Sequence, residues 1–505
     1  MSEEAAQQPV GSAREGPAAA GGLRRAVFLR NAGFLAAGEL LERGIGLAIA
    51  VLLARSLGVA GYGAVGVAVS TLAFLGIAIR VGTTPLGIRE VARHPQPAAI
   101  AALYGRIAGL RLVLASALLV LLVFGLGPLA RSLGVPPALL GLYALGLLPL
   151  ALAASWVFLG LERMHVVALG SLLERAVVLA ALWLLVRGPD PDLLRVPLVE
   201  VGAAALATLG YLLLLRGRGL VLRPRPSRAG LGLLGEGVPV ALAIALQTVY
   251  IQGDVMLLGW LSSTEAAGVF LASHKLVLTG SMVPTILQQA AFPATGRLLH
   301  RDRARAVALQ SSILRGSLAL VVPIGVLGSA AGPELLSLFY GAGFAEAAPV
   351  LRITLWTLPL VAIAGVQRAL LLAAGASKPL LLGVATGCVA HVALALVLIP
   401  AAGAKGAAVA CLLGEVLGVS TLVTLARLRL GRSALSPRAL APLAAGGLAL
   451  LPLALPGVGL PARLALAAAV YGAAALALGV VRREEVSPLL AWARSAWREA
   501  TGRRE

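Results

Sequence analysis

Charged side chains interrupt the long apolar stretches of this sequence, and their spacing limits what they can do. Glu42 and Arg43 follow Glu39 by three and four residues, which places all three on one face of a helix. A charge surrounded by hydrocarbon is unfavourable unless it has a partner or reaches water. This face should therefore border a polar cavity. Arg43 can contact an anionic ligand there or pair locally with Glu39, and both interpretations stay open.

Asp254 and Lys275 form a second candidate group, on either side of a predicted turn at Ser262-Ser263-Thr264. Asp254 lies about nine residues before this turn and Lys275 about twelve after it, so a helical rise of about 1.5 Å per residue gives depths that differ by less than about 5 Å. We therefore predict an Asp254–Lys275 ion pair. This pair could join two helices, or it could bind a substrate phosphate or a coupling ion.

The candidate site combines these groups with other charges of the apolar stretches. The candidate substrate-binding cations of the cavity are Arg43, Arg55, Arg80, Arg111, Lys275 and Arg315. The candidate coupling or charge-pair residues are Glu39, Glu42, Asp254 and His274. Arg55 and Arg80 lie near the ends of their stretches and could also extend to lipid headgroups. His274 and His391 lack the neighbouring ligands of a metal site, so we expect no metal.

Common enzyme and ATPase motifs are missing from the sequence. It contains no G-x-x-x-x-G-K-[ST], H-E-x-x-H or G-x-S-x-G pattern. Asp190-Pro191-Asp192 resembles a motif that holds a metal and a nucleotide sugar, but it lies in a short loop without a domain to bind the sugar. We therefore expect a protein that is not an enzyme and has no cofactor. Any energy input would come from an ion gradient, the membrane potential or substrate supply.

The overall composition excludes several classes of protein. Of the 505 residues, 59% are hydrophobic and only 13% are charged, against about a quarter in a soluble domain. With a mean hydropathy of +0.93, the chain has too little polar surface for a soluble enzyme, a disordered chain or a nucleic-acid-binding domain. Cys388 and Cys411 lie in apolar segments and are too few for a disulfide framework or a zinc site. The composition predicts an all-α, polytopic membrane protein.

Fourteen apolar stretches are long enough to cross a bilayer, which takes about 20 residues. Arg and Lys gather on one side of these spans, roughly 27 against 6, which predicts that both termini lie in the cytoplasm. Topology and attraction to anionic lipid thus explain most of the net charge of +20. The first stretch is too long for a cleaved signal peptide. The predicted spans are 28–54, 60–82, 105–127, 137–160, 164–186, 196–215, 231–260, 266–293, 307–331, 349–374, 379–400, 404–426, 439–456 and 461–481.

The two halves of the chain resemble each other at an offset of about 205 residues. Gly61-Tyr62-Gly63-Ala64-Val65 matches Ala266-Ala267-Gly268-Val269-Phe270, and Gly127-Pro128 matches Gly332-Pro333. Each copy has an even number of spans, six, so the copies share one orientation as a parallel repeat, with a binding site expected between two lobes. The predicted divisions are a disordered cytoplasmic tail (1–27), an N-terminal lobe (28–230), a C-terminal lobe (231–438), two further helices (439–481) and a basic cytoplasmic tail (482–505).

Several short motifs, in order along the chain, are similar to those of a known family. They are Leu53-Ala54-Arg55-Ser56-Leu57-Gly58, Arg89-Glu90-Val91-Ala92-Arg93, Asp254-Val255-Met256-Leu257-Leu258-Gly259, Gly268-Val269-Phe270 and Leu398-Ile399-Pro400. Through them, the chain resembles the polysaccharide biosynthesis/export branch of the multidrug/oligosaccharidyl-lipid/polysaccharide exporter superfamily, which includes O-antigen-type flippases. The resemblance covers roughly residues 30–425. His391 departs from it, because the family commonly has Asn there.

The resemblance implies two six-helix lobes around a central cavity. It implies that the protein flips a polyprenyl-diphosphate-linked oligosaccharide across the cytoplasmic (inner) membrane by alternating access. The implied partners are this lipid-linked oligosaccharide, membrane lipids, H+ or Na+ as coupling ion and a polysaccharide polymerase, with no nucleic acid. Two alternatives stay open: a lipid II flippase of peptidoglycan synthesis and a cation-coupled multidrug exporter. The surplus of Arg argues against the exporter, and so many buried charges argue against a membrane scaffold.

Overall fold

The computed structural model describes residues 17–186, 192–227 and 232–480, with most side chains from residue 41 onward. Most of the predicted N-terminal tail, the C-terminal tail, Asp190, Pro191 and the side chain of Glu39 lie outside the described residues. The first helix begins at Pro17, before the predicted end of the tail at residue 27. Asp192 is described, and its carboxylate accepts a hydrogen bond of 2.9 Å from the backbone N–H of Leu194, so it stabilises a turn.

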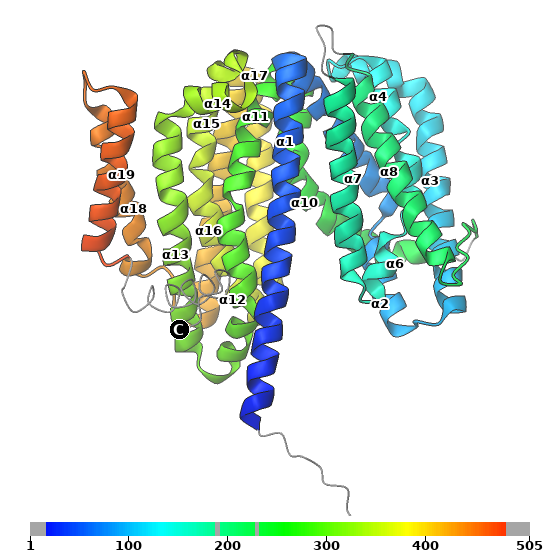
Figure 1. Ribbon diagram of the computed structural model, residues 1–505, viewed down its shortest axis with the longest axis horizontal. Helices are drawn as coiled ribbons and strands as arrows, with labels where there is room; N and C mark the ends of the chain where they lie inside the picture. Colours follow the sequence, from blue (N-terminus) through cyan, green and yellow to red (C-terminus); the bar gives the residue numbers. More distant parts are fainter. Residues whose placement is uncertain (1–16, 187–191, 228–231, 481–505) are drawn as a thin grey trace, which may run out of the picture.

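All regular secondary structure in these ranges is helical (Figure 1). A helix satisfies its backbone hydrogen bonds within itself, which a bilayer requires of long apolar segments. The α-helices are α1 (Pro17–Arg80), α2 (Thr83–Arg93), α3 (Pro97–Ser132), α4 (Pro137–Ala144), α5 (Leu147–Leu152), α6 (Ser155–Gly160), α7 (Met164–Leu185), α8 (Arg195–Arg216), α10 (Leu233–Leu261), α11 (Thr264–Gly280), α12 (Met282–Arg301), α13 (Arg303–Ala330), α14 (Gly332–Tyr340), α15 (Ala348–Leu355), α16 (Thr357–Ala373), α17 (Ser377–Leu430), α18 (Pro437–Ala449) and α19 (Leu460–Ala477). Two 3-10 helices are η1 (Ala342–Ala347) and η2 (Pro452–Ala454).

Helix α17 contains 54 residues but reverses at Gly403, whose φ of 52° and ψ of −129° are not helical. A straight helix of this length would extend for about 81 Å, against about 30 Å of hydrocarbon. The two arms pack closely: a side-chain carbon built at Gly406 would lie 2.0 Å from the Leu398 carbonyl oxygen, and one at Gly387 would lie 3.0 Å from Cα of Gly418. Glycine suits both the reversal and the contacts, because it tolerates a positive φ and lets backbones approach.

Helix α1 reverses in the same way at Gly58, where φ is 67° and ψ is −174°. Residues on both arms, including Ile49 and Val65, line one cavity, so the arms lie side by side. The described chain contains twelve helical stretches that are long and apolar enough to span a membrane, and two of them hold these reversals. Each of those two coincides with two predicted spans. The total of fourteen spans and the cytoplasmic location of both termini stay predictions.

The helices form two bundles, with α1 and α10 between them (Figure 1). The N-terminal bundle consists of α2–α8 and the C-terminal bundle of α11–α17. Helix α18 packs against α13, with α19 beside it at the left-hand edge of the view. Helix α1 contacts α7 as well as α10 and α11, so it belongs to the interface between the bundles. The predicted lobe boundaries at residues 230 and 438 stay predictions.

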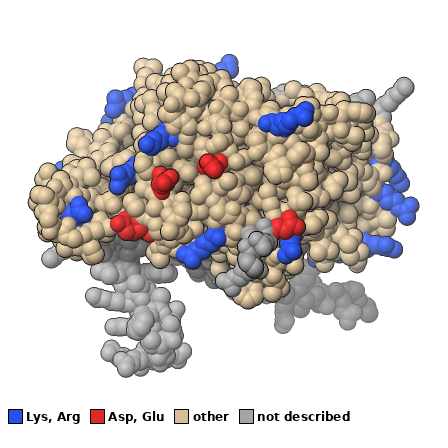
Figure 2. Space-filling model, turned by 90° about the horizontal axis from the view of Figure 1, so that it is seen from above, with Lys and Arg blue, Asp and Glu red and all other residues tan. Residues whose placement is uncertain are grey.

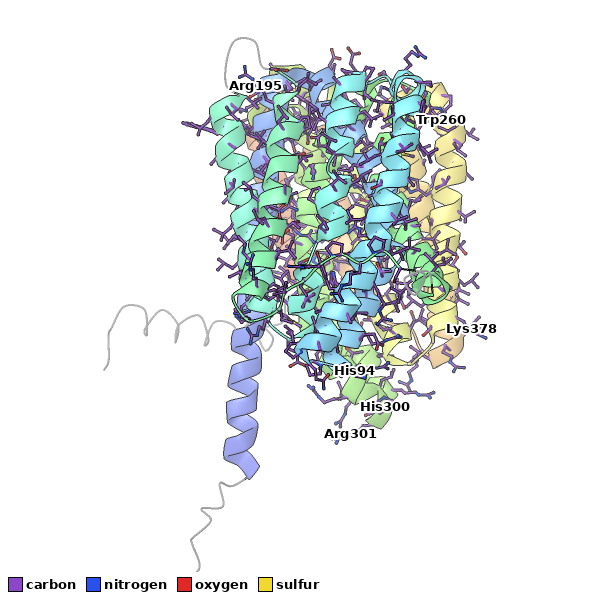
Figure 3. All side chains as sticks on the ribbon, turned by 90° about the vertical axis from the view of Figure 1, so that its right-hand side faces the viewer. His94, Arg195, Trp260, His300, Arg301 and Lys378 are labelled. Carbon is purple, nitrogen blue, oxygen red and sulfur yellow. The ribbon has the colours of Figure 1, made fainter. Side chains whose placement is uncertain are left out.

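The two ends of the molecule differ in the residues they carry. We call the end that holds Gly58 the upper end and the opposite end the lower end. Arg195 and Trp260 lie at the upper end, whereas His300 and Arg301 lie at the lower end (Figure 3). Seen from above, the visible surface is mostly uncharged, with scattered Lys and Arg rather than a continuous basic patch (Figure 2). This separation of Arg195 from Arg301 agrees with the order of the predicted spans.

Candidate functional site

A cavity of about 420 Å³ lies between the two arms of α1 and helices α7, α8, α10 and α11. The upper part of α1 contributes apolar wall, including the buried residues Ile49, Ala50 and Leu53. Six acidic or basic residues from four helices also line it: Glu42, Glu174, Arg175, Glu200, His274 and Lys275. The fold thus collects charges that lie far apart in the sequence, in the interface between the bundles.

The charges of the cavity interact with one another. Glu42 and Arg175 join α1 to α7 through an ion pair of 3.1 Å, and both side chains remain partly exposed. Glu200 accepts a hydrogen bond of 2.7 Å from the Tyr143 hydroxyl. Lys275 lies within electrostatic range of Glu200 and Arg175. A lysine ammonium attracts phosphate, and carboxylates accept hydrogen bonds from sugar hydroxyls, so this lining suits both parts of a phosphate-linked sugar.

Three of the predicted site residues line this cavity: Glu42, His274 and Lys275. Arg43 lies beside it, because its Nη1 donates a hydrogen bond of 2.9 Å to the carbonyl oxygen of Leu278, which is a lining residue. That bond connects α1 to α11 across the interface between the bundles. Arg43 itself does not belong to the described lining.

Two other predicted cations lie away from the cavity. Arg55 donates hydrogen bonds to the backbone carbonyls of Leu338 and Phe339, which ties α1 to α14 near the upper end. Arg315 is buried on α13 within the C-terminal bundle. The described lining includes neither of them.

Arg80, at the end of α1, and Arg111, on α3, form a separate basic group. Arg111 is almost completely buried on α3 and donates hydrogen bonds of 2.9 and 2.8 Å to the hydroxyls of Thr83 and Thr84. Arg80 lies within electrostatic range of Arg111. Arg80 and Arg111 are likewise outside the described lining of the cavity.

The predicted ion pair between Asp254 and Lys275 is wrong. Asp254 instead contacts His391 on α17, with 2.8 Å between its carboxylate oxygen and Nε2, and both side chains are almost fully buried. Helical rise gives the depth of a residue, but it does not give the direction in which the side chain points. Lys275 lines the cavity, whereas Asp254 points from α10 toward α17.

Cys411 lies close to the Asp254–His391 pair. The potential ligand atoms of these three residues all lie within 4.8 Å of one another. Carboxylate, imidazole and thiolate can each bind a metal, but Asp254 and His391 already contact each other directly. The expected absence of a metal stays a prediction. His274 lies within electrostatic range of Asp254 and His391, which connects this buried group to the cavity.

The sequence prediction does not select Glu200, Arg175 or His391 as site residues. A signal existed for each, because an ionisable residue inside an apolar span needs a partner. The sequence does not say which of the charged residues pair, because that depends on helix rotation and on which helices are neighbours.

Close backbone packing shuts the cavity at the upper end. A side-chain carbon built at Gly63 would lie 1.8 Å from the Thr264 carbonyl oxygen and 2.6 Å from the Gly268 nitrogen. Gly63 and Gly268 are equivalent positions in the predicted repeat, and they lie against each other in the structure. Beside them, the rings of Tyr62 and Tyr340 stack with centroids 6.3 Å apart. The structure therefore represents a conformation in which the bundles are joined at the upper end.

Apolar helices around a charged cavity that is shut at one end define a multi-pass membrane protein with a transporter fold. Solved structures support this class. The chain resembles the lipid II flippase MurJ in an inward closed conformation with a TM-score of 0.71 and 12% identity, over 88% of this chain and 98% of that one. It resembles an inward-facing multidrug resistance MATE family transporter with a TM-score of 0.64 and 14% identity, over 77% and 94% of the two chains.

Sequence comparison then gives the family. The model of the polysaccharide biosynthesis protein family matches residues 28–299, and this chain belongs to that family. No curated protein sequence gives a significant match. The expected fold, all-helical and related to the exporter superfamily, is confirmed by these comparisons.

Proposed function

We propose that this protein is a flippase that moves a polyprenyl-diphosphate-linked oligosaccharide across the cytoplasmic membrane by alternating access. The observation that carries the proposal is the mixed-charge cavity between the bundles, shut at the upper end by the Gly63–Gly268 contact. Lys275 and Arg175 supply positive charge for a diphosphate, and Glu174 and Glu200 supply acceptors for sugar hydroxyls. The membership of the polysaccharide biosynthesis protein family supports the same substrate class.

The direct test uses purified protein in liposomes without ATP. A fluorescent polyprenyl-diphosphate oligosaccharide is placed in both leaflets, and its loss of accessibility to an external quencher is followed. We expect movement that requires the protein and the diphosphate, with protein-free liposomes and a monophosphate-linked probe as controls. Absence of movement, together with ion-driven transport of a cationic dye, would overturn the proposal in favour of a multidrug exporter.

Lipid II flipping is the second candidate, because the fold resembles that of the MurJ flippase with a TM-score of 0.71. The two substrates share a polyprenyl diphosphate and differ in the attached group. Competition in the same liposomes separates them: unlabelled lipid II should slow movement of the oligosaccharide probe only if it occupies the same cavity. Lipid II that moves faster than every oligosaccharide tested would favour this second candidate.

Lys275→Gln should slow flipping by about 10- to 100-fold, because a hydrogen bond to a charged group contributes roughly 1.5–3 kcal/mol. Lys275 lines the cavity, and glutamine keeps a similar size while removing the charge. Lys378→Gln, at an exposed position near the lower end, is the matched control and should keep the wild-type rate (Figure 3). Equal rates for the two variants would show that Lys275 does not contact the diphosphate.

We assign the coupling ion to the Asp254–His391 pair, which is buried between α10 and α17 and lies within electrostatic range of His274 in the cavity. A proton that binds or leaves this pair would change the charge between α10 and α17. Flipping rates measured under imposed H+ and Na+ gradients test the assignment, and His391→Asn should remove the H+ dependence. A polysaccharide polymerase that receives the flipped substrate is the expected partner.

A further inference from the structure

A second cavity, of about 610 Å³, lies on the other side of α1 from the charged one. It is a groove lined by α1, α7 and α14, and its α1 residues run from Gly44 to Ser56, which corresponds to about 18 Å of helix. The lining includes Leu47, Val51, Leu52, Leu179 and Phe339 and is mainly apolar. Its one charged residue is Arg55, near the upper end.

Helix α1 is the wall between the two cavities. Residues such as Gly46, Ile49 and Leu53 face the charged cavity, whereas Gly44, Leu47 and Val51 face the groove. Helix α7 also contributes to both cavities. Arg175 and Val178 line the charged cavity, whereas Leu179 and Trp183 line the groove. The polar cavity and the apolar groove therefore both border α1 and α7.

The Glu42–Arg175 ion pair lies at the lower part of this contact. Both residues line the charged cavity, and the α1 and α7 residues that line the two cavities above them are mostly small or apolar, among them Ala50, Leu47 and Val178. An ion pair with partly exposed members adds little stability, so it can separate without a large penalty. Separation of this pair would open the lower part of the contact between α1 and α7 to a narrow chain.

We propose that the groove holds the isoprenoid chain of the lipid-linked substrate while the diphosphate lies in the charged cavity on the other side of α1. The proposal rests on the proposed function and specifies how one amphiphilic molecule would use both cavities. The apolar lining of the groove suits a hydrocarbon chain. The groove lies beside the charged cavity, as the chain lies beside the diphosphate to which it is bonded. Arg55, held by the carbonyls of α14, closes the upper end of the groove, so the chain lies along α1 below it.

Two glycines of α1 permit a direct test, because a side chain at either one meets open space. A side-chain carbon built at Gly44 or at Gly46 has no atom within 4 Å. Gly44→Trp fills the groove and Gly46→Trp fills the charged cavity. Gly472→Trp on α19, which is exposed and equally unobstructed, is the control for adding tryptophan to a membrane helix.

The experiment measures binding of two probes to the full chain in nanodiscs. The first is a fluorescent undecaprenyl-diphosphate oligosaccharide, and the second carries the same headgroup with a methyl group in place of the chain. We expect Gly44→Trp to weaken binding of the long-chain probe by at least about tenfold and to leave the methyl probe unchanged. Gly46→Trp should weaken both probes, and Gly472→Trp neither. If Gly44→Trp folds poorly, Ala48→Trp on the groove face of α1 replaces it, and we expect the same result.

The outcomes separate this proposal from the proposed function. If Gly44→Trp and Ala48→Trp leave the long-chain probe unaffected, or weaken both probes equally, the groove does not hold the chain, although the charged cavity still can bind the headgroup. If the wild-type protein binds neither probe, the proposed function itself fails. If phosphatidylglycerol displaces the long-chain probe from the wild-type protein as well as unlabelled substrate does, the groove is a general lipid site and the assignment is overturned.

Discussion

Gly63→Val is expected to abolish flipping. A side-chain carbon at residue 63 would overlap the Thr264 carbonyl oxygen and the Gly268 nitrogen, at 1.8 and 2.6 Å. These are backbone atoms, so no change of side-chain rotamer relieves the overlap, and the two bundles must separate at the upper end. A flippase that cannot shut one end loses alternating access. We expect the flipping rate in liposomes to fall by more than about 100-fold, which corresponds to roughly 3 kcal/mol or more.

Cysteine labelling tests whether the upper end has opened. Ser171 lines the charged cavity, and the natural Cys388 and Cys411 are buried, so Ser171→Cys is a suitable reporter. A membrane-impermeant maleimide added on the side of the upper end should label this cysteine when Gly63 is replaced by Val. It should leave the cysteine unlabelled in the protein that keeps Gly63. Gly46→Val is the matched control, because its side chain meets open space and should keep the upper end shut. Equal labelling in both backgrounds contradicts the role of the Gly63 contact.

His391→Leu should destabilise the protein by about 3–5 kcal/mol, because it leaves the buried Asp254 carboxylate without its partner. Leucine fills a similar volume, so the loss arises from the unpaired charge rather than from a cavity. The double variant Asp254→Leu/His391→Leu removes both groups and should recover much of the stability. Thermal unfolding in detergent, followed by tryptophan fluorescence, gives the midpoint of each variant.

The exposed His94 near the lower end supplies the control for the loss of a histidine. His94→Leu should leave the unfolding midpoint within about 1 °C of the wild-type value, because surface substitutions change stability little. A double variant that is as unstable as His391→Leu alone would mean that His391 acts through its packing against Tyr250, whose ring lies 5.9 Å away, rather than through Asp254.

The sequence predicted the helical spans well, because apolar length is a local property. Gly63 and Gly268, which are equivalent positions in the predicted repeat, meet in the structure. Both reversals occur at glycines between predicted spans, Gly58 and Gly403.

The sequence predicted the partners within the site poorly. Depth along a helix follows from residue number, so Asp254 and Lys275 were expected at one level. Rotation about the helix axis and the order of helices around the cavity depend on packing of the whole chain, and these send Asp254 to His391 and bring Glu200 beside Lys275.

The Asp254–His391 pair also constrains the biosynthesis of the chain. The two residues lie 137 positions apart, so α10 leaves the ribosome and enters the bilayer well before α17. During that interval the Asp254 carboxyl group has no partner from α17, so we expect it to remain in contact with water. The two arms of α17 pack through Gly387 and Gly418, so they can insert as one helical hairpin. This hairpin sets the depth of His391 in the bilayer. Docking of this hairpin is therefore the step at which Asp254 gains its partner, and a chain with His391→Leu would complete its insertion with this carboxyl group still unpaired.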